Sequence, residues 1–321
     1  MIDRLATFDS GSFDPYLNLA MEQHLLETVE SGCCLLYLWQ NQNTVVVGKN
    51  QNPWAECRVS LLESEGGHLA RRLSGGGAVF HDLGNLNFTF LVATADYDLA
   101  KQQRVLLEAC QSFGIPAELS GRNDLTADGR KFSGNAFYHN GPRSYHHGTL
   151  LVDVDGAKLQ RYLTPSKAKL EAKGVPSVRS RVVNLKELCP TLTINDLKQA
   201  LVAAFEEVYG LKSAPWTLAD PDRVTELREQ YAGWAWRYGQ RLPFTCRAEG
   251  RFAWGGVEVQ LCIDEGVIRQ AAVYSDDMDF AFPPALEQAL TGCAFRRDAL
   301  SENLRTVSHG MDIFTLLQQE I

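Results

Sequence analysis

The stretch Arg71-Arg72-Leu73-Ser74-Gly75-Gly76-Gly77-Ala78-Val79-Phe80-His81-Asp82 places three consecutive glycines between a basic pair and the start of an apolar segment. Glycine lacks a Cβ atom, so successive backbone N–H groups of such a loop can turn inward and form a nest for phosphate oxygens. An arginine beside the loop can add charge-assisted hydrogen bonds to the same anion. The stretch therefore predicts an anion or nucleotide site, and a plain turn is the alternative interpretation.

The composition is that of an ordinary globular protein. The chain has 321 residues, of which 45% are hydrophobic, enough for a sizeable core and for two domains. A formal net charge of -8 argues against a general nucleic-acid or membrane-surface binder, because both depend on concentrated positive charge. The N-terminal residues lack the apolar core of a signal peptide, and no apolar run has the length of a membrane helix. We therefore expect a cytoplasmic protein with neither a nucleic-acid nor a membrane partner.

The cysteines and histidines do not predict a metal site. The eight cysteines are scattered without a C-x-x-C pair, so we expect them to be reduced and mostly buried. His139, His146 and His147 lie close together in the sequence, but adjacent residues of a strand point to opposite faces, and no matching carboxylate pattern accompanies them.

The N-terminal part predicts one helix and then strands. Asp14-Pro15 is typical of an N-cap followed by proline at the first helical position, and apolar residues then recur at helical spacing as far as Val29. Residues 35–39 and 44–47 are short apolar runs separated by a polar turn, which predicts an antiparallel strand pair.

Further elements follow the glycine loop. Residues 86–90 alternate between apolar and polar, as in a half-buried strand, and residues 105–113 indicate a helix. Residues 131–151 predict a hairpin with its turn at Asn140-Gly141-Pro142. Lys131 opens this hairpin, so its ammonium group could reach a ligand on the sheet face that carries the glycine loop. A solvated surface lysine is the alternative.

The composition changes after residues 234–239, and from Arg251 apolar residues alternate again on either side of a turn at Asp264-Glu265-Gly266. This pattern predicts a small α/β C-terminal domain. We place the boundary so that residues 1–246 form the first domain and residues 247–321 the second.

Several separated motifs resemble those of bacterial lipoate-protein ligase A, in the same order along nearly the whole chain. They lie at residues 51–54, 71–90, 121–125, 130–134, 146–151, 173–185 and 252–258. The resemblance implies an α/β (α+β) fold, namely a biotin/lipoate-protein-ligase-like catalytic domain with mixed sheets and packed helices, plus the small accessory C-terminal domain. That fold is shared with biotin ligases and octanoyl transferases, so it does not by itself fix the reaction.

The resemblance also implies a two-step ligation. Lipoate would attack the α-phosphate of ATP, which Mg²⁺ accompanies, to give lipoyl-AMP, and an acceptor lysine would then take the acyl group. The implied acceptors are apo lipoyl domains of 2-oxoacid dehydrogenase E2 subunits and the glycine-cleavage H protein. Similarity assigns the following roles: Lys131 is catalytic; Arg72, Gly77, Ala78, Val79, Phe80 and Lys131 bind ATP; and Lys131, Trp39, Gly75, Gly76 and His147 bind lipoate.

Other positions carry two interpretations. Asn123 and Asp124 would position the nucleotide or its Mg²⁺, or would simply form a turn. His147 would lie near the acyl carbonyl, or would be a strand histidine bonded to backbone groups. Trp39 would line the slot for the dithiolane chain, or would belong to the core.

Two other functions remain open. An octanoyl or lipoyl transferase of this superfamily works through a cysteine thioester, but no cysteine lies in the motifs at 71–82, 121–134 or 173–185. The second alternative is a ligand-binding relative that lacks one of the two half-reactions. Because every proposed ligand contact of the ligase lies before residue 185, we expect the C-terminal domain, from about residue 247, to be a mobile lid rather than part of the active-site floor.

Overall fold

The computed structural model describes residues 1–121, 123–164, 182–238, 246–264 and 266–320. In the larger, N-terminal unit the elements are β1 (Arg4–Asp9), α1 (Pro15–Thr28), β2 (Cys33–Trp39), β3 (Thr44–Val47), α2 (Pro53–Glu56), α3 (Val59–Ser64), β4 (His68–Arg71), β5 (Val79–His81), β6 (Asn85–Ala93), α4 (Leu99–Gln111), β7 (Ala117–Ser120), β8 (Asp124–Ala127), β9 (Arg130–Asn140), β10 (Arg143–Leu151), α5 (Gly156–Tyr162), α7 (Leu185–Leu188), α8 (Ile194–Tyr209), β11 (Ser213–Pro215), α9 (Pro221–Ala232) and α10 (Trp234–Tyr238). The C-terminal unit contains β12 (Cys246–Arg251), β13 (Gly256–Asp264), β14 (Val267–Ser275), α11 (Phe282–Leu290), α12 (Arg297–Leu304) and α13 (Gly310–Leu317).

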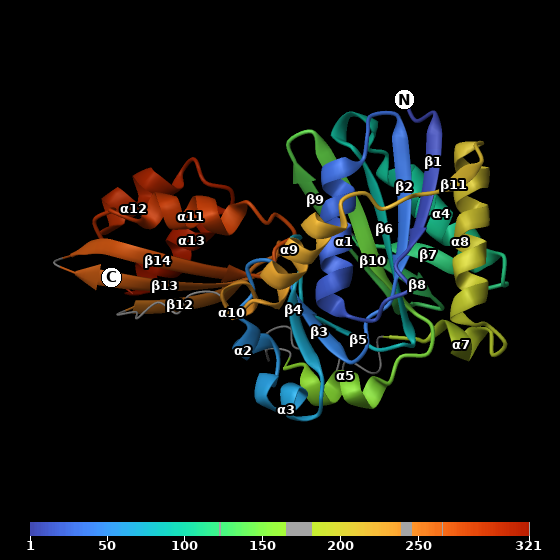
Figure 1. The fold of residues 1–321 in the computed structure, drawn as a ribbon. Coiled ribbons are helices and arrows are strands. Elements are labelled where there is room, and N and C mark those ends of the chain that lie inside the picture. The colour runs from blue at the N-terminus through green and yellow to red at the C-terminus, as the bar shows by residue number, and fades with distance from the viewer. Residues whose placement is uncertain (122, 165–181, 239–245, 265, 321) are drawn as a thin grey trace.

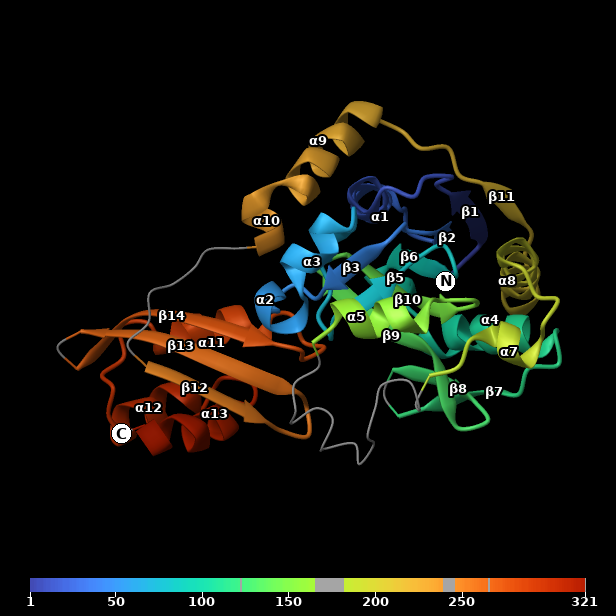
Figure 2. The same cartoon turned by 90° about the horizontal axis from the view of Figure 1, so that it is seen from below.

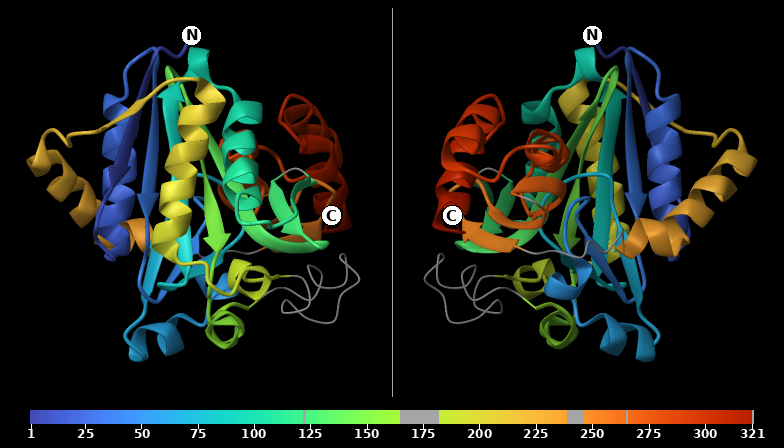
Figure 3. Two further views of the ribbon diagram at one scale, coloured as in Figure 1. Left: turned by 90° about the vertical axis from the view of Figure 1, so that its right-hand side faces the viewer. Right: turned by 90° about the vertical axis from the view of Figure 1, so that its left-hand side faces the viewer.

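An eight-stranded mixed sheet is the centre of the larger unit, with strand order β11-β1-β2-β6-β10-β9-β8-β7 (Figure 1). β1 is parallel to both β2 and β11, whereas the other pairs are antiparallel. Helices α1 and α9 cover one face, and α4 and α8 cover the other (Figure 3). This arrangement confirms the expected α/β fold of mixed sheets and packed helices.

The first helix begins as the sequence predicts. The carboxylate of Asp14 accepts a hydrogen bond from the backbone N–H of Tyr16 at 2.9 Å, and Pro15 occupies the first turn, where its missing N–H costs nothing. The hairpin of β9 and β10 is also confirmed, with its first strand beginning at Arg130.

Two sequence-based expectations were wrong. β2 and β3 do not form an antiparallel pair, because both edges of β2 are taken by β1 and β6. Instead, β3 is the middle strand of a second, three-stranded sheet with the order β4-β3-β5. β6 is buried along its whole length rather than on one face, since helices cover both sides of the large sheet. The polar residues of β6 therefore lie inside the protein.

The small sheet carries the glycine loop. Its outer face packs against α3 and α5 through a separate apolar cluster that includes Val45, Leu69 and Phe80. Ala70, Val46 and Val79 pack instead with the cluster of the large sheet. The loop between β4 and β5 is thus held next to the large sheet.

In the C-terminal unit, β12, β13 and β14 form an antiparallel sheet whose core is shared with α11, α12 and α13. Figures 1 and 2 show this unit on the side of the larger unit that carries α2 and α10. The two units have separate apolar cores. Among the described helices none combines the length and the apolarity needed to cross a membrane.

Candidate functional site

Two backbone segments meet at the glycine loop. Gly76 has a φ of +89°, a left-handed conformation that glycine adopts at little cost. A Cβ atom on Gly48, in the loop that follows β3, would lie 2.2 Å from the carbonyl oxygen of Gly76. Both glycines are therefore required for this close approach, which explains the tight geometry of the loop without any ligand.

The buried side chain of Arg72 holds the glycine loop through hydrogen bonds. Its guanidinium donates to the carbonyl oxygens of Gly75 at 2.7 Å, Gly77 at 2.9 Å and Val46 at 3.2 Å, and its Nε donates to Ser74 Oγ at 3.0 Å. Burial lowers the pKa of Arg72 to about 10, which leaves it charged at neutral pH. The structure thus gives Arg72 a direct role in shaping the loop, and its contact with ATP stays a prediction.

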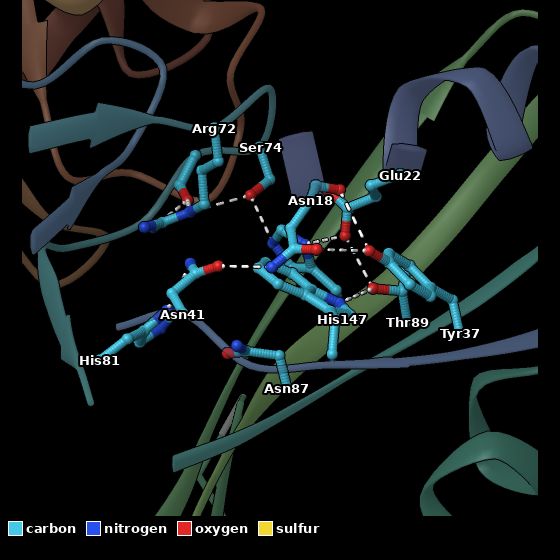
Figure 4. A network of polar contacts seen from close by, with 12 residues as sticks. Asn18, Glu22, Tyr37, Asn41, Arg72, Ser74, His81, Asn87, Thr89 and His147 are labelled. Atoms are coloured by element: carbon cyan, nitrogen blue, oxygen red, sulfur yellow. Dashed lines mark hydrogen bonds and ion pairs between the residues drawn. The ribbon is translucent and has the colours of Figure 1, made fainter. Parts of the chain in front are cut away.

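A buried chain of polar groups continues from Arg72 to α1. Ser74 Oγ lies 2.8 Å from His147 Nε2, and His147 Nδ1 lies 2.8 Å from a carboxylate oxygen of Glu22 (Figure 4). Thr89 donates to the same Glu22 oxygen and accepts from the indole N–H of Trp39. Neutral His147 with its proton on Nδ1 satisfies both of its contacts, because Ser74 can then donate to Nε2.

Glu22, Ser74 and Thr89 belong to this network but were not predicted as site residues from the sequence. Glu22 lies among the apolar residues that α1 buries, including Leu19 and Leu25, and a carboxylate there is the signal that could have marked it. His147 is buried and bonds to side chains rather than to backbone groups, so the second interpretation of this residue was wrong.

Lys131 lies on β9, and its ammonium group lies next to the backbone of Gly134. Its Nζ is 2.7 Å from Asp124 Oδ1, and a Cβ atom on Gly134 would approach that Nζ to 2.9 Å. Gly134 in turn donates to Thr149 Oγ1, and Thr149 lies two residues from His147 on β10. Lys131, His147 and the glycine loop therefore border the same side of the large sheet. The Lys131 side chain is 37% exposed and free to meet a ligand.

Other predicted site residues have structural roles in the fold. The side-chain amide of Asn123 donates to the Asn135 carbonyl, so its role in the structure is to link β8 to β9. The Phe80 side chain is buried in the outer cluster, so any contact of Phe80 with a nucleotide would come from its backbone. Trp39 is buried beside Thr89 in the large sheet. The segment 173–181 of the motif at 173–185 falls outside the described residues.

The C-terminal unit reaches the glycine loop through residues 275–280. The N–H of Gly76 donates to the Asp277 carbonyl at 2.9 Å, and the side-chain amide of Asn50 donates to the Phe280 carbonyl at 2.9 Å. The ring of Phe280 stacks on Tyr138 with centroids 4.6 Å apart. In this structure the C-terminal unit therefore forms part of the loop's surroundings.

The cysteines do not contribute to the site. The described cysteines form no disulfide, and Cys33, Cys34, Cys57, Cys110 and Cys293 are buried, as expected. Burial raises the pKa of Cys110 to about 12, so this thiol is not an activated nucleophile. Within the described ranges no three His, Cys, Asp or Glu residues gather as a metal site would require.

Lys49, next to the loop, gives a pH-dependent prediction. Its Nζ lies 3.7 Å from the ring centroid of Trp236, and burial, together with the charge of Arg71, lowers the pKa of Lys49 to about 8. In the unfolded chain the pKa returns to about 10.4, so between these values the unfolded state binds more protons and stability rises with pH. We expect the free energy of unfolding to rise from pH 8 to pH 10 in the wild type more than in Lys49→Met. Urea denaturation at each pH measures this free energy. The same pH dependence in both proteins would contradict a lowered pKa of Lys49.

Comparison with known proteins identifies the family of this chain. The family model of the lipoyl protein ligase A/B catalytic domain matches residues 14–206, and that of the bacterial lipoate protein ligase C-terminus matches residues 242–321. The chain belongs to the lipoate-protein ligase family. One of the two matches falls in each unit of the structure.

Solved structures of the lipoate-protein ligase family have the same fold. P. falciparum LipL1 in complex with lipoate is 26% identical, with 97% of this chain and 98% of that chain covered and a TM-score of 0.85. Lipoate-protein ligase A bound with ATP is 25% identical, with 74% and 99% covered and a TM-score of 0.64. A bi-partite archaeal ligase from Thermoplasma acidophilum, described with its E2 lipoyl domain, is 24% identical, with 77% and 100% covered and a TM-score of 0.66, a likeness in fold.

Proposed function

We propose that this chain activates lipoate with MgATP and transfers the lipoyl group to a lysine of apo lipoyl domains, such as those of E2 subunits and the H protein. The observation that carries the proposal is the position of Lys131 on the sheet face that also carries His147 and the glycine loop. Family membership and the lipoate-bound and ATP-bound relatives support it.

Both steps build up negative charge that Lys131 can offset. In the first, a carboxylate oxygen of lipoate attacks the α-phosphorus of ATP, and pyrophosphate leaves. In the second, the neutral acceptor amine attacks the acyl carbon and the oxyanion forms. AMP then leaves with the electrons of the acyl–oxygen bond, and the amine nitrogen loses a proton as the amide forms. A positioned ammonium group stabilises developing charge in both transition states. Mg²⁺ enters as part of the substrate, held by the phosphates.

The deciding experiment incubates the full chain with lipoate, MgATP and an apo lipoyl domain, and weighs the acceptor by mass spectrometry. We expect a mass increase of one lipoyl group that requires ATP and releases pyrophosphate. Acyl transfer from an acyl-carrier protein without ATP would favour the transferase instead. Adenylate formation without transfer would identify a relative that lacks the second half-reaction.

We further propose that residues 247–321 form a separate domain that leaves the glycine loop when a phosphate binds there. The Asp277 carbonyl occupies the N–H of Gly76, one of the donors that a phosphate nest would use. Both acceptors cannot hold the same N–H at once. Phosphate binding and the contact of residues 275–280 are therefore mutually exclusive at this donor.

A substitution at Gly75 tests whether this contact holds the two units together. A Cβ atom there would lie 2.3 Å from the Asp277 carbonyl oxygen, which belongs to the backbone and cannot rotate away. We expect Gly75→Ala to separate the two units and to raise the radius of gyration measured by small-angle scattering. Gly156→Ala is the matched control, since a Cβ atom there meets nothing within 4 Å. An unchanged profile for folded Gly75→Ala would show that the contact does not hold the units together.

A further inference from the structure

Two side-chain nitrogens are buried on the sheet side of the network without an acceptor. Asn87 and His81 are 1% and 3% exposed, and neither Asn87 Nδ2 nor His81 Nε2 has a hydrogen-bond partner within the described part of the chain. A buried polar group without a partner is costly, so each such group in a folded protein requires an explanation. A bound ligand that supplies hydrogen-bond acceptors would be one such explanation.

The surrounding bonds fix His81 Nε2 as a donor. The side-chain amide nitrogen of Asn18 lies within hydrogen-bond distance of the carbonyl oxygens of Ser12 and Gln40, which can only accept. The same nitrogen donates to Asn41 Oδ1, so Asn41 Nδ2 must donate to His81 Nδ1, 3.2 Å away. Burial lowers the pKa of His81 to about 3, and the neutral ring then carries its one proton on Nε2.

Asn87 presents a second donor. Its Oδ1 accepts from the side-chain amide of Asn85 at 2.9 Å, which leaves Nδ2 with two hydrogens and no acceptor among the described residues. Trp39 is the neighbour of Asn87 on β2, and its ring is 6.2 Å from that of His81, centroid to centroid. In Figure 4 the Asn87 amide points toward the side of the network on which His81 lies. Both donors thus flank the residue expected to line the slot for the acyl chain.

The distance from Lys131 agrees with the end of an acyl chain. Asn87 pairs with Thr149 on β10, and Thr149 accepts from Gly134 on β9, the residue over which the Lys131 amine lies. Asn87 is therefore two strands from that point, about 10 Å across the sheet. A medium-chain acid with its carboxylate at Lys131 would bring its far end to this region.

We propose that Asn87 and His81 are specificity-determining residues that select an acid with hydrogen-bond acceptors at its far end, the disulfide form of lipoate, over an unsubstituted acid such as octanoate. This inference rests on the proposed function and deepens it. The sulfur atoms of the dithiolane are weak acceptors for N–H groups. The hydrocarbon end of octanoate cannot accept at all and leaves both donors unpaired.

Calorimetric titration of the full chain with lipoate and with octanoate, without ATP, tests the proposal. We expect the wild type to bind lipoate at least tenfold more tightly. Asn87→Leu and His81→Phe remove the donors at similar size, and each should lower the ratio of the two affinities severalfold. Asn140→Leu, the same change at an exposed position of the hairpin turn, is the control and should leave the ratio unchanged.

Equal binding of the two acids by the wild type, or no binding of either, would overturn the proposal even if a variant fails to fold. So would an unchanged ratio in folded Asn87→Leu and His81→Phe. ATP-dependent acceptor modification is a separate readout. A chain that prefers lipoate in the expected way but forms no adenylate keeps this inference and removes the proposed function.

Discussion

Replacing Lys131 by methionine is expected to slow adenylate formation by a factor of about 100 to 1,000, the usual loss when one positioned donor is removed from a developing negative charge. Lys131 is partly exposed, and among the described residues its ammonium group pairs with Asp124 on the neighbouring strand, so the variant should fold with almost unchanged stability. ATP–pyrophosphate exchange in the presence of lipoate measures the first step.

The matched control is Lys186→Met. Lys186 also forms one ion pair across the surface, with Asp153, but lies away from the glycine loop on α7. The Lys186→Met variant should catalyse ATP–pyrophosphate exchange at the wild-type rate. Near-normal exchange in Lys131→Met would remove Lys131 from the chemistry and leave the lysine as a surface residue of the hairpin.

Arg72→Met is expected to lower both stability and activity. The substitution leaves the carbonyl oxygens of Val46, Gly75 and Gly77 without their buried donor. We expect the free energy of unfolding to fall by about 3 kcal/mol, since each unpaired buried group costs about 1–3 kcal/mol and part of the loop can relax. Urea denaturation measures this loss, and pyrophosphate exchange should fall with it because the glycine loop loses its shape.

Arg104→Met provides the comparison for Arg72. Arg104 pairs with Glu108 one helical turn along α4 at the surface, and its removal should change stability by less than about 0.5 kcal/mol. If Arg72→Met proved as stable as Arg104→Met, the five side-chain hydrogen bonds of Arg72 would not be what holds the loop.

The sequence predicted those parts of the fold whose signals are local. The cap at Asp14, the helix it starts and the turn between β9 and β10 depend on residues within a few positions of one another. The glycine loop could likewise be recognised in the sequence, because its three glycines directly follow a pair of arginines. The pairing of β3 with β4 and β5 was not, since strand partners are set by the whole chain and a polar turn can lead into another sheet.

The site was predictable to the same extent. Lys131 and His147 were named from the sequence, and the structure places both on one side of the large sheet. The partners of His147 come from α1 and from Ser74 and are unrelated to it in sequence spacing. Asn87 looked like the exposed half of an alternating strand, and only the second helical layer shows that it is buried. The contact between Asp277 and Gly76 joins residues some 200 positions apart, which no local pattern reveals.

If the glycine loop binds the phosphates of a nucleotide as we propose, the hydrogen bond between Gly76 and Asp277 couples nucleotide affinity to the position of the 275–280 segment. A phosphate oxygen can bind this N–H only in molecules whose 275–280 segment has withdrawn, so the measured dissociation constant is the intrinsic one divided by the fraction of such molecules. Whatever holds the segment in place, including the stacking of Phe280 on Tyr138, weakens nucleotide binding by the same free energy. Residues that never contact the nucleotide can in this way set the concentration at which it binds.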